Sequence, residues 1–439
     1  MRRVMLIFAL VSQLSVSAAY AGEGDAILNI LLKKGIITEQ EYKTIKEELK
    51  AGGEAQKAEV NRETAEAIEQ APPKEEAGWT KRLKVSGLLE GEYRWRKRSD
   101  VSNRNSGSAS DLYLRRFELG LEAQPKDWMK VSSVLNSEWV GDSVNQGDEK
   151  ITVDQAIITF QKKEFPVYLV LGKRTQPFGV FTNHLVTDPM TQDAYEAKRV
   201  GVSLGMTGPL GLDVSATVYK GEVQMDRLLG SGLFEAARTG APADDVASYI
   251  FSSSVSPLED HLTFFLSYLS EPGRGKRNST VNIGLSAAVP GLEGLRLDAE
   301  YMKALARERY AGLSEAFKEG ILSVTASYVF NHHHGERHED LGDVTLQERV
   351  THLFEEPMEL ALRYERFDDD DLAEKTASWS AKNRYSLGVR YPIYKDAERG
   401  LTAFVAAEYR YTDYRLHSSL TDVRADNNKE LYLKLGVGF

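Results

Sequence analysis

The stretch Leu431-Tyr-Leu-Lys-Leu-Gly-Val-Gly-Phe439 closes the sequence and alternates strictly between two kinds of side chain. Successive side chains of a β-strand point to opposite faces, so alternation with a period of two predicts a strand. One face of this strand carries only leucine, valine and phenylalanine, and the other carries Tyr432, Lys434 and two glycines. A soluble sheet with one buried face and a membrane barrel with one lipid-facing side both fit this pattern.

The same alternation recurs from about residue 81 onward, in the segments 83–96, 116–123, 200–207, 281–289 and 401–410. Tight turns alternate with longer polar connections, which we expect at 98–111, 141–149, 175–198, 222–245 and 368–381. Short turns at one end and long loops at the other are typical of transmembrane β-barrels. We therefore predict an all-β, antiparallel transmembrane barrel of about sixteen strands, with eighteen as the alternative. The region 319–355 is where the strand count is ambiguous, since 323–330 predicts a good strand and 344–354 a poor one.

The segment before residue 81 has a different character. Residues 1–21 predict a secretory signal peptide, with Arg2 and Arg3 ahead of a short apolar core and Ala19-Tyr-Ala21 as the cleavage site. Residues 22–50 predict a short helical hairpin. It resembles the periplasmic N-terminal segments of several large porins, which implies either a role in oligomerisation or cell-wall contact, or a simple spacer. Residues 51–80 predict a polar linker or a solvated helix, and residues 81–439 the barrel.

Composition excludes several classes of protein. The chain of 439 residues has no cysteine, which rules out disulfides, thiolate metal sites and covalently attached haem. Its formal charge of −10 makes nucleic acid an improbable partner. No metalloprotease, nucleophile-elbow or phosphate-loop motif occurs, so we expect neither an enzyme nor a cofactor. After the leader, no apolar run approaches the ~18 residues that a spanning helix needs.

Charged residues on the polar face of the predicted strands are candidates for the pore lining. We expect that lining to include Arg94, Arg96, Arg116, Glu118, Glu122, Arg174, Arg384, Arg390 and Glu408. Arginines that face carboxylates across a water-filled pore would create a transverse field. The alternative is that they are ordinary solvated ion pairs.

The connection 175–198 is the candidate for a constriction loop, because proline stiffens it at two points and Gly179 allows a sharp turn. Its candidate residues are Pro177, Phe178, Gly179, Asp188, Pro189, Asp193 and Glu196. We expect it to fold into the lumen and to set the size limit of the pore. A surface loop shaped by its prolines is the alternative.

A histidine-rich run holds His332, His333, His334 and His338, which together could bind a transition metal. Opportunistic metal binding by a loop is the alternative. Four consecutive aspartates at 368–371 predict either a divalent-ion contact with lipopolysaccharide or a solvated loop tip.

Several motifs resemble known families. The run Leu171-Gly-Lys-Arg174, followed by Pro177-Phe-Gly179 and Thr187-Asp-Pro-Met190, resembles the siderophore porins typified by the legiobactin receptor of Legionella. The run Leu114-Arg-Arg-Phe117 is more distantly similar to phosphate-selective-type porins. The last strand resembles the closing strand of bacterial outer-membrane barrels, in which a terminal phenylalanine such as Phe439 is part of the assembly signal.

These resemblances imply a bacterial outer-membrane protein with its N-terminal segment in the periplasm. They imply membrane lipid, lipopolysaccharide and the barrel assembly machinery as partners, together with a homo-oligomer formed through the N-terminal helices. The implied function is passive or facilitated diffusion of small solutes, with siderophore or iron uptake as its narrower form. The alternative is a barrel that sheathes haem proteins supplied by partners in an electron conduit.

Overall fold

The computed structural model describes residues 83–100, 107–142, 150–221, 224–234, 245–258, 261–273, 275–292, 294–309, 316, 318–330, 357–370, 379–396, 400–416 and 425–439. The chain divides into two units, Met1–Gly78 and Trp79–Phe439, and every described residue belongs to the second. The predicted signal peptide, helical hairpin and linker therefore lie outside the described residues, as does the histidine-rich run.

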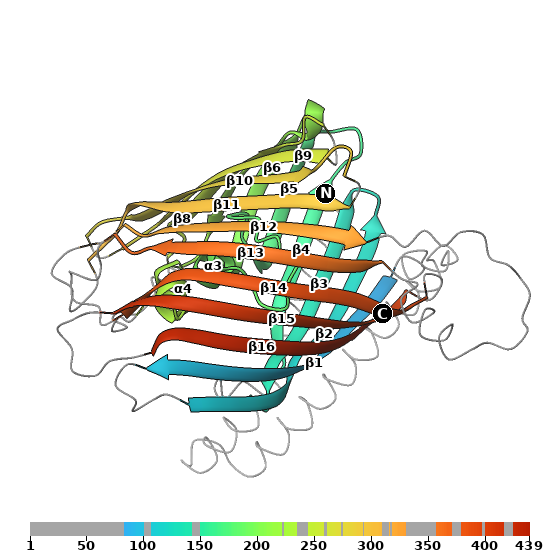
Figure 1. Ribbon diagram of the computed structural model, residues 1–439. Coiled ribbons are helices and arrows are strands. Elements are labelled where there is room, and N and C mark those ends of the chain that lie inside the picture. Colours follow the sequence, from blue (N-terminus) through green and yellow to red (C-terminus); the bar gives the residue numbers. More distant parts are fainter. Residues whose placement is uncertain are drawn as a thin grey trace, which may run out of the picture. The chain divides into compact units, whose positions relative to one another are not determined.

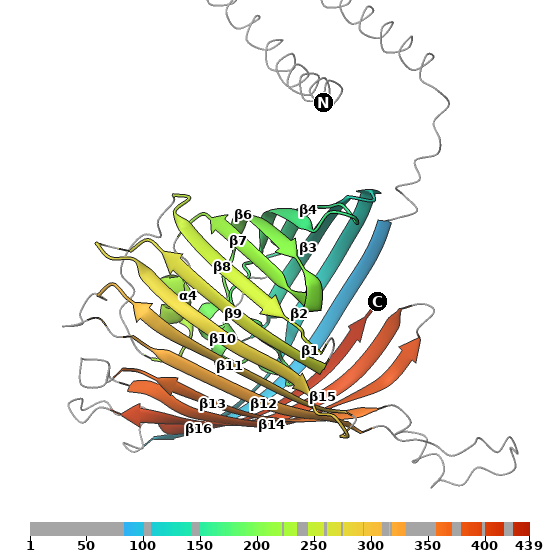
Figure 2. The ribbon, with the colours of Figure 1, turned by 90° about the horizontal axis from the view of Figure 1, so that it is seen from above.

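The described residues contain sixteen strands that form one closed antiparallel barrel (Figures 1 and 2). They are β1 (Leu83–Asp100), β2 (Gly107–Lys126), β3 (Met129–Val140), β4 (Thr152–Gln161), β5 (Val167–Thr175), β6 (Lys198–Thr207), β7 (Asp213–Tyr219), β8 (Ser248–Val255), β9 (Leu262–Glu271), β10 (Asn278–Ala288), β11 (Leu295–Ala306), β12 (Gly320–Phe330), β13 (Met358–Asp368), β14 (Trp379–Asp396), β15 (Leu401–Leu416) and β16 (Ala425–Gly438). The predicted fold class is confirmed.

The final strand closes the barrel by pairing with the first. In this register Leu89 lies opposite Val437 and Tyr93 lies opposite Leu433. Gly87 and Phe439 extend the ladder, because each backbone N–H donates to the carbonyl of the other at 2.8 and 3.0 Å. A Cβ on Gly87 would lie 2.5 Å from the Phe439 ring, so only glycine lets this ring lie against the first strand.

Most apolar residues of the strands point outward. Leu204 and Ile283 are each 56% exposed, whereas their neighbours Ser203 and Asn282 are 1% exposed. A soluble sandwich would bury the apolar face, so this arrangement is the reverse of a soluble core and suits a lipid environment. None of the helices in the described part of the chain has the length and hydrophobicity that a membrane span requires.

The ambiguous region resolves into a single strand, β12, within the described residues, and the ring closes at sixteen. The alternative of eighteen strands is not needed, and residues 344–354 lie outside the described part. Two predicted loops are shorter than expected: β1 continues to Asp100 and β2 begins at Gly107, and β14 begins at Trp379. These strand ends lack a regular apolar–polar alternation and are rich in serine and charged residues, which is why the sequence pattern placed them in loops.

The long connection between β12 and β13 attaches at the end of the barrel that carries the short turns. β12 ends at Phe330 and β13 begins at Met358, so the histidine-rich run belongs to this connection. The β2–β3 and β6–β7 turns lie at the same end, because strands alternate in direction around an antiparallel barrel.

Candidate functional site

The connection between β5 and β6, residues 176–197, crosses the interior of the barrel; we call it the inner loop. Its Val180 N–H donates to Oε1 of Glu300 on β11 at 2.8 Å. Further along, the Thr187 N–H and hydroxyl both donate to the Glu408 carboxylate on β15 at 2.7 Å. Lys434 on β16 reaches the Val186 carbonyl at 3.4 Å. A segment that starts on β5 and contacts β11, β15 and β16 must run through the lumen.

Backbone geometry turns the inner loop inward at its start. Gly179 has φ of +87°, a conformation that glycine adopts without strain, and Phe181 follows with φ of +54°. A Cβ on Gly179 would lie 2.5 Å from the Phe181 ring and 2.7 Å from the Met302 side chain. Pro189 then caps the short helix α3 (Met190–Tyr195) in an extended conformation. The motif residues thus shape the loop.

Arg363 on β13 binds the middle of the inner loop through several hydrogen bonds, and its side chain is fully buried. Its Nη2 donates to the Thr187 carbonyl at 3.0 Å and to the Asp188 carbonyl at 3.2 Å. Its Nη1 donates to Oδ1 of Asn183 at 3.2 Å. The guanidinium also pairs with Glu365 at 3.2 Å, and Glu365 accepts a hydrogen bond from the Met190 N–H. A planar cation with five donors suits such a junction.

His184 forms a second attachment between the inner loop and the wall. Its Nδ1 lies 2.6 Å from Oε1 of Glu359 on β13, and its Nε2 lies 3.0 Å from Oδ2 of Asp298 on β11. Both carboxylates favour the doubly protonated imidazolium, which can donate from both nitrogens. The hydrogen bonds to Asp298 and Glu359 raise the pKa of His184 to about 9, although partial burial opposes this.

This raised pKa predicts a pH-dependent loop. The ordinary histidine pKa is about 6.5, so protonated His184 stabilises the inner loop fully below that pH. This stabilisation is lost as pH rises through about 9. We expect open-channel current noise in planar bilayers to increase between pH 7.5 and about 9.5 as the loop loosens. The H184Q variant should already be noisy at pH 7.5 and should show little further change. Identical pH profiles for the two proteins would contradict the attachment.

The apolar side of the inner loop packs on a second inward segment. Residues 224–234 include the helix α4 (Gln224–Gly230), and the Gln224 N–H donates to Oε2 of Glu271 on β9 at 2.7 Å. Leu228, Leu233 and Phe234 join α3 in a buried apolar cluster with inner-face residues of the strands. The inner loop contributes Phe178, Met190, Ala194, Tyr195 and Ala197 to this cluster, and the strands contribute Tyr219, Ile250, Leu269, Met302, Ile321, Phe367 and Ala381.

The expectation that 222–245 is a polar outer loop is therefore wrong for its described part. Leu228, Leu233 and Phe234 are buried where apolar residues of the wall, such as Ile250, Leu269 and Phe367, interrupt its polar inner face. Phe178 is 1% exposed within this cluster and meets the Tyr195 ring edge-on at a centroid distance of 6.0 Å. Apolar packing thus fills the part of the lumen that borders β7, β8, β9, β11, β12, β13 and the start of β14.

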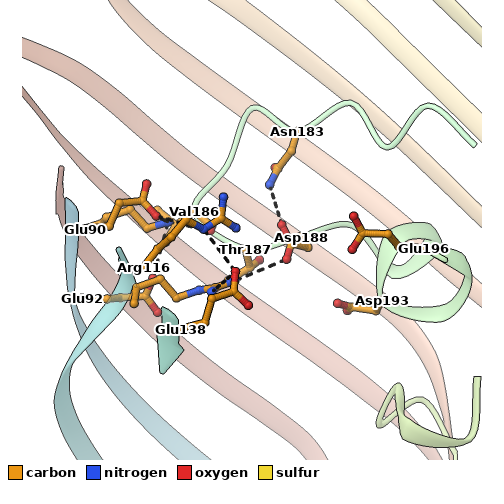
Figure 3. Close-up of polar contacts among 12 residues, drawn as sticks. Glu90, Glu92, Arg116, Glu138, Asn183, Val186, Thr187, Asp188, Asp193 and Glu196 are labelled. Atoms are coloured by element: carbon orange, nitrogen blue, oxygen red, sulfur yellow. Dashed lines mark hydrogen bonds and ion pairs between the residues drawn. The ribbon is translucent and has the colours of Figure 1, made fainter. Parts of the chain in front are cut away.

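The charged residues of the inner loop pair with the wall. Asp193 pairs with Arg384 at 3.1 Å, and Asp188 lies 3.6 Å from Arg115. Glu196 accepts a hydrogen bond from the Thr175 hydroxyl at 3.1 Å. Figure 3 shows Asp188 and Val186 of the loop facing Glu90, Arg116 and Glu138 of the wall.

The remaining pore-lining candidates lie on the inner face but are spread along the barrel. Arg94 pairs with Asp142 at 2.9 Å, and Arg96 follows it on the same face of β1. Arg116 pairs with Glu118 at 3.3 Å, and Glu122 pairs with Lys130 at 2.6 Å near the short β2–β3 turn. Arg174 donates to the Ser203 hydroxyl at 2.7 Å, and the Arg390 guanidinium stacks on the Phe404 ring at 4.0 Å.

Sequence reasoning missed Arg115, because strict alternation places it on the outer face. A β-bulge in the pairing of β1 with β2 pairs Glu90 with Arg116 but Gly91 with Leu114, so Arg115 is the extra residue. It turns inward, is 7% exposed, and stacks on the Trp139 ring at 3.8 Å. No local signal marks this bulge. Arg363 and Glu365 were also missed, although they alternate with Leu362 and Tyr364 and period two places them inward.

No group of three or more potential metal ligands occurs within the described ranges. His332, His333, His334 and His338 lie outside those ranges. The second and third aspartates of the acidic run make internal contacts. Asp369 is 3% exposed and pairs with Arg415 at 2.9 Å, and Asp370 accepts a hydrogen bond from the Lys318 N–H at 2.9 Å. At these two positions the run is not a solvated tip.

A polar cavity of about 170 Å³ remains between the inner loop and the wall; we call it the loop cavity. Loop residues 183–186 and 188 border it on one side, and residues of β1, β2, β14, β15 and β16 border it on the other. With a share of liquid volume of about 30 Å³ per water molecule, it has room for a few waters or a small solute.

No protein-family model and no curated protein matches the sequence. Solved structures do match by fold. The outer-membrane channel DcaP of Acinetobacter baumannii aligns at 12% identity over 81% of this chain and 96% of that chain, with a TM-score of 0.53. OmpF of Salmonella typhi, in complex with daunomycin, aligns at 14% identity over 81% and 97%, with a TM-score of 0.52. This chain thus has the barrel fold of outer-membrane channels of the porin type.

Proposed function

We propose that this protein is a porin-type channel of a bacterial outer membrane through which small polar solutes diffuse passively. The observation that carries the proposal is a closed barrel with an apolar outer face and an inner loop bound across a polar lumen. A pore discriminates by its diameter and by the charges at its narrowest point. The inner loop supplies both, since it reduces the free cross-section and brings Asp188 and His184 toward the arginines of the wall.

The narrower form of the proposal, siderophore or iron uptake, rests on the resemblance of the 171–190 motifs alone. In the structure these motif residues shape the loop and fill the apolar cluster: Gly179 turns the chain, Phe178 is buried and Pro189 caps α3. Their chemistry therefore supports a constricted channel more directly than it supports any one solute. A sheath for haem proteins would need an open lumen, whereas the inner loop crosses this one.

Conductance measurement tests the proposal. Purified protein reconstituted into planar bilayers should give discrete, ohmic conductance steps in potassium chloride. Heat-modifiable migration on gels provides the control for a folded barrel. A folded barrel that gives no steps would contradict the channel function, and absorbance from co-purified haem would favour the sheath instead.

A further inference from the structure

The loop cavity is lined by more positive than negative charge. Its bordering cations are Arg115, Arg116, Arg390, Lys434 and His184, and its bordering carboxylates are Glu90 and Asp188. The charge of the His184 imidazolium is offset by its two partners, Asp298 and Glu359, so the arginines and Lys434 supply the positive charge of the lining. A cavity with low-dielectric walls focuses the field of such a lining, so it attracts anions.

Several cationic donors of the cavity have incomplete partners among the described residues. Nη1 of Arg115 and Nε of Arg116 are buried and donate no hydrogen bond there. Their nearest carboxylate oxygen, Oε1 of Glu138, lies 3.5 and 3.4 Å away, at the outer limit of a hydrogen bond. Both donors are ion-paired with Glu138 but lack a hydrogen bond of normal geometry, so an anion that accepted from them would supply one.

Arg390 offers the third guanidinium. In the described part of the chain it makes no ion pair, and its guanidinium lies 4.0 Å over the Phe404 ring. Glu359, its register partner on β13, is engaged by His184 instead. The stacked geometry leaves the edge of the guanidinium, where its N–H donors lie, available to a planar acceptor.

The cavity also has an apolar part. Leu185 and Val186 of the inner loop and Phe404 and Ala406 of β15 border it. Leu185 packs on Gly388, where a Cβ would lie 2.4 Å from the leucine side chain, and Phe404 packs on Gly436 in the same way at 2.3 Å. The glycines therefore let both apolar groups lie flat against the wall beside the arginines.

We propose that the loop cavity is a binding site for a small organic carboxylate with a short apolar body. Guanidinium groups bind carboxylates bidentately, which an inorganic halide cannot reproduce, and the Leu185–Phe404 side accommodates the body. The carboxylate is held by Arg115, Arg116 and Arg390. The proposal rests on the channel function, and it adds a class of solute to it.

Benzoate is the probe, titrated onto single channels in potassium chloride. Benzoate should reduce the conductance with saturation, and benzylammonium, which has the same ring and the opposite charge, should not. R390Q and R116Q should each raise the benzoate concentration for half-block about tenfold, as expected for loss of one charge-assisted hydrogen bond. R174Q is the matched control, because Arg174 lies on the inner face outside the cavity and donates a hydrogen bond to Ser203. Benzoate should block R174Q channels at the same concentration as wild-type channels.

The outcomes separate the two proposals. Conducting channels that benzoate leaves unchanged, or that benzylammonium blocks equally, overturn the carboxylate site and leave the channel function standing. An equal loss of benzoate affinity in R174Q and R390Q also overturns the site, since the overall charge of the lumen would then explain the block. Absence of conductance in folded protein overturns the channel function itself.

Discussion

Deleting residues 182–194, with a short Gly–Ser bridge in their place, should raise the single-channel conductance about twofold or more and admit larger sugars in liposome-swelling assays. The segment carries Thr187, which bonds Glu408, and Met190 and Ala194, which fill the apolar cluster. Its removal opens the loop cavity to the rest of the lumen. The sheet should persist, because each strand keeps its two hydrogen-bonded neighbours around the ring.

The deletion exposes part of the apolar cluster, so Leu228 and Phe367 gain contact with water. At roughly 25 cal/mol per Å² of apolar surface this lowers stability without opening the barrel. The matched control replaces residues 344–356, an equal number, in the connection that attaches at the short-turn end. That variant should conduct like the wild type. Unchanged conductance after removal of 182–194 in a normally folded barrel would place the constriction elsewhere.

Replacing Arg363 with methionine should release the middle of the inner loop while the barrel stays folded. The change removes the hydrogen bonds to the Thr187 and Asp188 carbonyls and leaves Glu365 and Glu408 without their shared cation. Loss of one partner of a buried ion pair typically costs about 3–5 kcal/mol, and entry of lumen water will bring the value toward the lower end. We expect faster hydrogen exchange in 183–190 and frequent current fluctuations.

Two further variants make the Arg363 prediction specific. R363K keeps the charge but cannot reproduce a fork of five donors, so it should restore little of the loop protection. R366M changes the neighbouring arginine of β13, which is exposed on the outer face, and should behave like the wild type. Wild-type exchange rates in R363M would show that the loop is held by its apolar contacts alone.

Strands β1 and β2 show how well the alternation of side chains predicts which residues face the lumen. Alternation places Arg94 and Arg116 on the inner face, where the structure has them, because side chains of a regular strand alternate whatever surrounds them. It failed at Arg115, because one bulge shifts the phase of the strand and no residue type marks the shift. A single extra residue therefore changed which arginines border the loop cavity.

The amino-acid sequence by itself determined the strands, their inward and outward faces, the closing strand that ends at Phe439, and the stiff segment between Pro177 and Pro189. These properties arise from neighbouring residues, through side-chain alternation and backbone restriction, so they are readable locally. Only the tertiary structure decided what the inner loop binds. Thr187 bonds Glu408 across 221 positions and Met190 bonds Glu365 across 175, and closure of the ring is what brings such residues together. The polarity of the loop cavity likewise follows from five strands meeting one loop, which no local pattern specifies.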